Sequence, residues 1–238
     1  GALLGLFSRY SFFRRRVSNE CIRCMRCAAA RTEASPPSSP RRAATPIAAA
    51  PARWQEALPD MERFGELFAW EIGRRMPYVD RTVTTPLGTA IVPVLREQPV
   101  LATILRAGLP LHQGLLNCFD RADNAFISAY RKHEGDEEHF EVEIEYLASP
   151  SLEGRTVILS DPMLATGGSL IDTMSALVEK GASDLRAVCV VAAPEGIEAV
   201  NEKYPEMLIF TAAVDSHLND MKYIVPGLGD FGDRYFGT

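Results

Sequence analysis

The chain has 238 residues, of which 47% are hydrophobic, so it can form one large globular domain or two small ones around a buried core. Its net charge of −6 is unevenly distributed, because residues 1–53 contain ten arginines, no lysine and two acids, whereas the rest carry 15 basic and 29 acidic side chains. This acidic body repels a nucleic-acid backbone, which disfavours an RNA-binding regulator and means that any bound anion must be held by a local site.

Residues 1–55 form an Arg-, Ala-, Ser- and Pro-rich tail without an apolar period, and we expect this tail to be disordered or targeting-like. An organellar transit peptide, a truncated reading frame and a solvated tail all fit this composition. Cys21, Cys24 and Cys27 suggest an iron–sulfur or zinc site, but no fourth ligand follows at a useful spacing, so we disfavour a metal role. No stretch of the sequence reaches the roughly 18 apolar residues of a membrane helix. We expect a cytoplasmic protein, or an organellar one if the tail is a transit peptide.

The folded domain is expected over residues 56–238, with regular patterning from Met61 onward. Residues 61–75 have the spacing of an amphipathic helix, whose predicted core residues are Phe64, Leu67, Phe68 and Ile72. Shorter elements follow, predicted as a buried strand at 99–105, a helix near 110–119 and a strand at 124–132. Residues 139–147 alternate apolar with polar side chains, which indicates one arm of a β-hairpin with a solvated face.

The second half of the chain alternates strands with helices. The predicted strands are 155–160, 186–194 and 207–214, and the predicted helices are 169–181 and 196–204. The first of these helices should turn four apolar side chains inward, namely Leu170, Met174, Leu177 and Val178. Buried strands separated by helices predict an α/β fold, with a mostly parallel sheet flanked by helices and with ligands bound at the carboxyl ends of the strands.

The segment 157–170, VILSDPMLATGGSL, lies at one of these strand ends. Residues 165–169 offer free backbone N–H groups at the start of a helix, which suits a phosphate monoester, and Thr166 and Ser169 add hydroxyl groups. No lysine follows the glycines, which disfavours a nucleoside-triphosphate P-loop. Asp161 can accept hydrogen bonds from vicinal sugar hydroxyls or hold a hydrated magnesium ion, so the loop suits a ribose 5-phosphate. The alternative is an N-capping turn whose glycines only satisfy the backbone.

Two arginines follow predicted strands. Arg106 comes directly after one buried strand and Arg131 ends the next, so both can reach the carboxyl edge of the sheet. Their planar guanidinium groups match a pyrophosphate, although an ordinary surface position is the alternative for each of them.

The C-terminus contains a literal Gly-x-Gly-x-x-Gly pattern at Gly227, Gly229 and Gly232. A dinucleotide-binding fingerprint must open a helix inside a strand–helix–strand unit, and only six residues remain after Gly232. We interpret the pattern as a tight loop whose backbone groups can bind a small flat ring, with a purely structural turn as the alternative.

Four motifs in order resemble uracil phosphoribosyltransferase, a type I phosphoribosyltransferase: ILRAG at 104–108, VILSDPMLATGGSL at 157–170, VAAPEGI at 191–197 and YIVPGLGDFGDRYFGT at 223–238. The likeness runs from about residue 60 to the end. It implies the type I phosphoribosyltransferase fold, with a β-hairpin flap around 132–147 and a C-terminal base-binding loop. It also implies the reaction of uracil with 5-phosphoribosyl 1-pyrophosphate (PRPP) to give UMP and pyrophosphate, in pyrimidine salvage.

The resemblance further implies roles for individual residues. The catalytic residues would be Asp161, Arg106, Arg131 and Asp230, with both arginines on the pyrophosphate. The residues on the ribose 5-phosphate of PRPP would be Asp161, Pro162, Met163, Leu164, Ala165, Thr166, Gly167, Gly168 and Ser169. Those that bind uracil through backbone groups would be Ile224, Gly229, Asp230 and Phe231. The implied cofactor is Mg²⁺, held by substrate and water near Asp161 or Asp230. A homodimer or larger homo-oligomer and GTP as a candidate activator are also implied, with no nucleic-acid or membrane partner.

The sequence departs from the family pattern in three places. Ser160, rather than a second acid, precedes Asp161; this fits the uracil branch but weakens direct metal ligation. Phe231 stands where many bacterial members have alanine, which would narrow the base pocket. The basic, threonine-containing segment usually found upstream of the first core helix is not recognisable. A non-catalytic sensor of UMP or PRPP on the same fold is the alternative function.

Overall fold

A seven-stranded, mostly parallel β-sheet forms the centre of the computed structural model, which describes residues 58–132 and 141–237. The strands are β3 (Val100–Leu105), β4 (Asp123–Lys132), β5 (Glu141–Ala148), β6 (Thr156–Ser160), β7 (Met163–Leu164), β8 (Asp184–Ala192) and β9 (Leu208–Val214). They lie in the order β5, β4, β3, β6, β8, with β7 and β9 both paired to β8. Only the edge pair of β4 and β5 is antiparallel among these described pairings.

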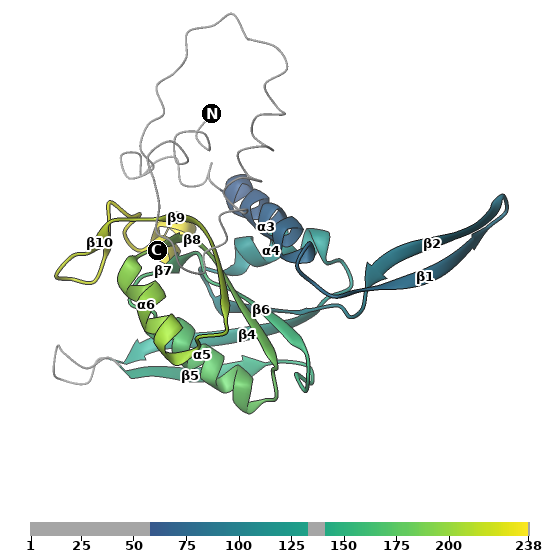
Figure 1. The fold of residues 1–238 in the computed structure, drawn as a ribbon. Coiled ribbons are helices and arrows are strands. Elements are labelled where there is room, and N and C mark those ends of the chain that lie inside the picture. Colours follow the sequence, from purple (N-terminus) through teal and green to yellow (C-terminus); the bar gives the residue numbers. More distant parts are fainter. Residues whose placement is uncertain (1–57, 133–140, 238) are drawn as a thin grey trace, which may run out of the picture.

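Helices cover both faces of this sheet (Figure 1), as the alternating pattern predicts. One face packs against α3 (Leu58–Gly73) and α4 (Leu109–Cys118), and the other against α5 (Gly168–Glu179) and α6 (Pro194–Lys203). Successive strand residues point to opposite faces. Ile158 accordingly joins the core beneath α3 and α4, whereas Val157 and Leu159 join the core beneath α5 and α6. Two apolar layers therefore clamp the sheet and hold its strand ends in place.

The predicted helix faces are largely confirmed. In α3, Phe64, Phe68 and Ile72 are buried and Leu67 packs against the same core. In α5, the prediction for Val178 is wrong, because this side chain is 44% exposed. Each helical residue turns the chain by about 100°, so the position after the buried Leu177 already faces away from the sheet.

Two of the predictions concern residues that lie outside the described part of the chain. These are the tail at 1–55 with Cys21, Cys24 and Cys27, and the tip of the predicted flap. The flap's two arms are β4 and β5, paired from Phe126↔Ala148 to Lys132↔Glu141. Over the described ranges, no helix is long and apolar enough to cross a membrane.

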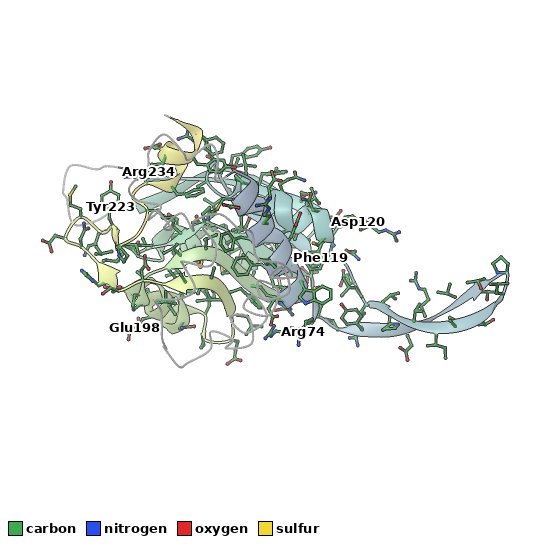
Figure 2. The ribbon with its side chains drawn as sticks, turned by 90° about the horizontal axis from the view of Figure 1, so that it is seen from above. Arg74, Phe119, Asp120, Glu198, Tyr223 and Arg234 are labelled. Carbon is green, nitrogen blue, oxygen red and sulfur yellow. The ribbon has the colours of Figure 1, made fainter. Side chains whose placement is uncertain are left out.

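A hairpin that the sequence analysis missed projects from the body of the molecule (Figures 1 and 2). It consists of β1 (Tyr78–Thr85) and β2 (Gly88–Leu95), and all eight residues of β1 are exposed. Cross-strand pairs such as Val79↔Val94 and Val83↔Ala90 put apolar side chains on one face of this ribbon, together with Arg81, and Ile91 and Leu95 lie on the other face. Pro93 is tolerated in β2 because a strand in a two-stranded ribbon has a free edge.

Helices α3 and α4 cross at a point where two glycines meet. A Cβ on Gly65 would lie 2.7 Å from the Cα of Gly114, and one on Gly114 would lie 2.8 Å from the Cα of Gly65. Both distances are far below normal van der Waals contact, so the helices can approach this closely only without side chains at the crossing. The crossing fixes α4, whose start lies directly after the strand end that carries Arg106.

We predict that Gly65→Ala destabilises the protein by about 1–3 kcal/mol, because the added methyl group forces two backbones apart. Gly73→Ala is the matched control in the same helix, since its Cβ would have only ordinary contacts at 3.9 and 4.0 Å. The control should leave stability unchanged or raise it by up to about 1 kcal/mol through better helix propensity. Urea unfolding followed by circular dichroism measures both, and equal effects of the two variants would contradict the close-crossing explanation.

Candidate active site

A cavity of about 600 Å³ opens at the carboxyl ends of β3 and β6. Four stretches that are distant in sequence line it together with Ser128 of β4, namely residues 104–107, 161–170 except Pro162, 221–224 and 230–233. Each stretch contains residues that the sequence analysis singled out, although Ile224 is the only residue of the third stretch to which it gave a role. The site therefore lies at the sheet edge where an α/β fold binds its ligands.

Two buried hydroxyl groups hold the strand ends together beneath the cavity. Thr103 is paired with Ser160 across the parallel ladder, and its Oγ1 donates to the Ser160 carbonyl oxygen at 3.4 Å. The Ser160 hydroxyl in turn donates to the carbonyl oxygen of Ala102 at 3.1 Å. A side chain on Gly108 would collide with Thr103 Oγ1 and the Ser160 carbonyl oxygen. Ser160 thus supports the turn at 106–108 from below, which gives a structural reason for a serine before Asp161.

The predicted phosphate loop lies at the cavity, directly before α5. Its residues 163–169 line the cavity, whereas Pro162 is buried and does not. Gly167 has φ of +86°, a left-handed conformation that favours glycine, and it precedes the first turn of α5. Gly168, Ser169 and Leu170 of that turn line the cavity, and the first N–H groups of a helix have no partner within the helix, which suits an anion. Asp161 lines the same wall, and its Oδ1 accepts a long, weak hydrogen bond of 3.5 Å from the Met163 N–H.

Arg106 lies at the mouth of the cavity. Its Nη2 is 3.2 Å from Oδ1 of Asp233, and its guanidinium carbon lies 5.7 Å from the ring centre of Phe236. Both charged side chains are about half exposed, so the pair is solvated and can exchange for another anion. Arg131 is the next to last residue of β4, but its side chain is outside the described part of the structure.

The C-terminal loop and α7 (Phe231–Phe236) form the part of the wall beside Arg106. Gly227 and Gly229 both have left-handed φ values, of +50° and +72°. Asp230 caps α7 by accepting a 2.9 Å hydrogen bond from the Asp233 N–H. Gly227 and Gly229 thus lie in the loop between β11 (Ile224–Val225) and α7.

The predicted base-binding residues separate into two groups. Ile224, Asp230 and Phe231 line the cavity, whereas Gly229 is close by but does not. The Phe231 ring is 2% exposed and stacks on Tyr235, with ring centres 5.2 Å apart. Burial raises the pKa of Tyr235 to about 12. Most of the phenyl ring is thus buried in the core, so Phe231 narrows the base pocket less than the size of its side chain suggests.

The sequence analysis missed three lining residues, Met221, Lys222 and Tyr223. They form the turn between β10 (His217–Leu218) and β11 (Ile224–Val225). Lys222 has φ of +63°, unusual for a residue with a side chain. The signal available in the sequence was a lysine directly before the C-terminal motif.

Metal-ligating side chains are sparse in the described residues, which contain no group of three His, Cys, Asp or Glu side chains that could hold an ion. Asp161 and Asp230 both line the cavity and supply carboxylate oxygens, which are the ligands that magnesium prefers. The donor set therefore suits an ion that is held mainly by a substrate and water.

Comparison with known proteins decides the family. Residues 45–238 match the family model described as uracil phosphoribosyltransferase. The chain belongs to the uracil phosphoribosyltransferase family. A uracil phosphoribosyltransferase of Porphyromonas gingivalis is 46% identical over 180 residues, which cover 75% of this chain and 83% of that protein. The corresponding protein of Agrobacterium fabrum is 44% identical over 179 residues, covering 75% and 84%.

The fold of this family member is the predicted type I phosphoribosyltransferase fold. The solved structure of the AQ2163 protein from Aquifex aeolicus superposes with a TM-score of 0.72 at 32% sequence identity. The match covers 81% of this chain and 92% of that one.

We predict that Gly167→Ala weakens binding of ribose 5-phosphate roughly tenfold or more, because small displacements of a binding group are costly. The new Cβ would lie 3.1 Å from the Gly196 carbonyl oxygen in an already left-handed residue. Gly154→Ala is the control, since Gly154 also has a left-handed φ of +70° but no atom within 4 Å of the added Cβ. Both variants bear a backbone penalty of about 1–2 kcal/mol, but only the first should lose affinity in calorimetric titration.

Proposed function

We propose that this protein is a uracil phosphoribosyltransferase, which converts uracil and PRPP into UMP and pyrophosphate in pyrimidine salvage. In this reaction a uracil nitrogen forms a bond to the anomeric carbon of the ribose. The bond from that carbon to the pyrophosphate oxygen breaks, its electrons leave with pyrophosphate, and the uracil nitrogen loses its proton.

One observation carries the proposal: the phosphate loop, Arg106 and the C-terminal loop line one cavity in a member of this family. A ribose 5-phosphate at residues 161–169 would place its anomeric carbon between Arg106 and the C-terminal loop. The named relatives support the same activity, because they are uracil phosphoribosyltransferases that match three-quarters of this chain.

Charge stabilisation is the main catalytic task that the residues have to perform. Breaking the anomeric bond develops positive charge on the ribose, as in glycoside hydrolysis, and negative charge on the leaving group. Arg106 and Arg131 would neutralise the pyrophosphate, and Mg²⁺, when bound to PRPP, would supply further positive charge. The C-terminal loop would align the uracil nitrogen through its backbone groups, and the flap formed by β4 and β5 would exclude water.

An enzyme is favoured over a non-catalytic sensor. Asp161, Arg106 and Asp230 all line the cavity, and a sensor of UMP has no need of a group for pyrophosphate. Cytoplasmic localisation, with an organelle as the alternative, stays a prediction.

The direct test is conversion of labelled uracil to UMP by the full chain, with cytosine, hypoxanthine and orotate as competing bases. Turnover with uracil alone is expected. Removing Mg²⁺ with a chelator should abolish turnover, and adding GTP tests its role as an activator. Tight UMP binding without any turnover would reject the enzyme in favour of the sensor.

We predict that Asp161→Asn lowers kcat about 100-fold or more, since it removes a charge that faces the reacting sugar. The amide can still accept the weak bond from the Met163 N–H, so the fold should be intact by circular dichroism. Asp120→Asn is the matched control, because Asp120 is an exposed aspartate that does not line the cavity and lies across the body from the cavity-lining Tyr223 (Figure 2). Loss of folded structure in Asp161→Asn would reject the assignment of Asp161 to the ligand.

We predict that Arg106→Ala weakens the binding of PRPP about 10- to 100-fold and the binding of UMP much less, because UMP has no pyrophosphate to pair with the guanidinium group. Calorimetric titration of both ligands measures the difference. Arg121→Ala, at an exposed arginine outside the cavity lining, serves as the control. Equal losses for PRPP and UMP would contradict the pyrophosphate role.

We also propose that the protein is a homodimer in which the β1–β2 hairpin packs against a second copy. A two-stranded ribbon is only marginally stable alone in water. This ribbon nevertheless presents apolar side chains on both faces, with Val79 and Val83 each 38% exposed on one face and Ile91 70% exposed on the other. A second copy would bury these apolar side chains symmetrically.

We predict that Val83→Lys shifts the protein toward monomer, because it places a charge among the apolar side chains of the hairpin. Val178→Lys is the matched control, since Val178 is a 44% exposed valine on α5, outside the hairpin. Sedimentation equilibrium should show a weakened dimer for the first variant only. A wild-type chain that sediments as a monomer would rule the proposal out.

A further inference from the structure

The base-side wall of the cavity is carried by a hairpin too small to hold itself in place. Strands β10 and β11 have two residues each, paired as His217↔Val225 and Leu218↔Ile224. The turn between them contributes Tyr223, which Figure 2 shows at the end of the molecule away from the β1–β2 hairpin. Two residue pairs cannot define a stable position in water, so contacts to the body must do so.

Asp215 makes one of these contacts from beneath the loop. It follows β9 directly, and only 8% of its surface is exposed. Its Oδ2 accepts a buried 2.9 Å hydrogen bond from the N–H of Gly227, which lies in the turn between Ile224 and Asp230. The Asp215 N–H donates at 2.8 Å to the carbonyl oxygen of Ala192, the last residue of β8. This carboxylate therefore ties the C-terminal loop to the end of the central sheet.

Glu195 makes a second contact at the other end of the same hairpin. It lies in the first turn of α6, and its Oε1 accepts a 2.9 Å hydrogen bond from the Leu218 N–H. This bond holds the pKa of the Glu195 carboxyl below its usual range, so the group is charged at neutral pH. Unlike Asp215, Glu195 is exposed, so water weakens its contribution.

The motif VAAPEGI, residues 191–197, also supports the phosphate side of the cavity. The Ala193 N–H donates at 2.8 Å to the carbonyl oxygen of Leu164 in the phosphate loop. A Cβ on Gly196 would collide with the carbonyl group of Ala165 in that loop. One turn thus contacts the phosphate loop through Gly196 and the base-side hairpin through Glu195.

We propose that Asp215 and Glu195 are positioning residues that set the base-binding loop at the distance from the phosphate loop that uracil requires. The inference deepens the proposed function and rests on it. If backbone groups of the C-terminal loop bind the base, the side chains of that loop do not fix the position of the base. The position of the loop itself must then be fixed by residues packed behind it. Displacement of such groups by about 1 Å is enough to cost roughly 100-fold in rate.

The test compares steady-state kinetics of the full-length wild type with those of Asp215→Ala, Asp215→Asn and Glu195→Ala. Asp215→Ala should raise the KM for uracil roughly tenfold or more, with the KM for PRPP changed less than about twofold. Asp215→Asn retains an acceptor oxygen and should recover part of this loss. Glu195→Ala should raise the KM for uracil only about two- to fivefold, because its bond is exposed. Discrimination between uracil and cytosine should fall in the same order.

Two further variants separate positioning from general destabilisation. Gly196→Ala should show the converse pattern, with a raised KM for PRPP, because its new methyl group displaces the phosphate loop instead. Glu198→Ala removes an exposed carboxylate further along the same helix (Figure 2) and should match the wild type. Thermal unfolding of each variant gives the stability change independently of kinetics.

Three results would overturn the inference: an Asp215→Ala variant with an unchanged KM for uracil, equal rises in both KM values, or an Asp215→Asn variant no better than alanine. Each of these leaves the proposed function intact, because the wild type still turns over uracil. A wild type that lacks uracil turnover would instead overturn the proposed function, and this inference with it.

Discussion

The parallel pairing of β3 with β6 places Val100 opposite Val157 and Thr103 opposite Ser160, so that β3 ends only two residues beyond the end of β6. The turn carrying Arg106 and the loop carrying Asp161 must therefore begin side by side. Buried hydroxyl groups reinforce this register, because Thr103 and Ser160 each donate to a backbone carbonyl of the neighbouring strand. A ligand with two anionic ends can bridge the two loops only because the register has already brought them together.

The loops that line the cavity are held in place by contacts behind the wall. Gly108 lies against the end of β6, Gly196 lies against the phosphate loop, and Asp215 holds the C-terminal loop. These contacts explain why the site needs few charged side chains. Backbone N–H groups are fixed dipoles, and once oriented they bind an anion or a flat ring without reorganising. Buried neighbouring residues orient these N–H groups without facing the ligand themselves.

Local patterns predicted the elements that bury a continuous face. The α3 stripe of Phe64, Phe68 and Ile72 has the helical period, and the apolar runs of β3, β6 and β8 indicate buried strands. The β1–β2 hairpin was missed because its strands do not pack against the core of the chain. Their sequences therefore lack the regular alternation of buried apolar and exposed polar residues that indicates a strand. The hairpin's threonine- and valine-rich arms around a Pro-Leu-Gly turn were the available signal. Val178 was wrongly predicted to be buried, because an apolar residue next to the buried stripe of a helix can still face solvent.

The sequence alone determined the α/β class and predicted a phosphate loop at 161–169 and a base-binding C-terminal loop, since each depends on residue types at short spacing. Tertiary structure decided which of these loops meet. The pairing of Arg106 with Asp233 spans 127 positions, and the bond from Gly227 to Asp215 joins two separate loops across the end of β9. Contacts of this kind depend on strand order and helix packing, which are properties of the whole fold. No short window of residues contains the information that brings Asp215 beneath the base-side loop.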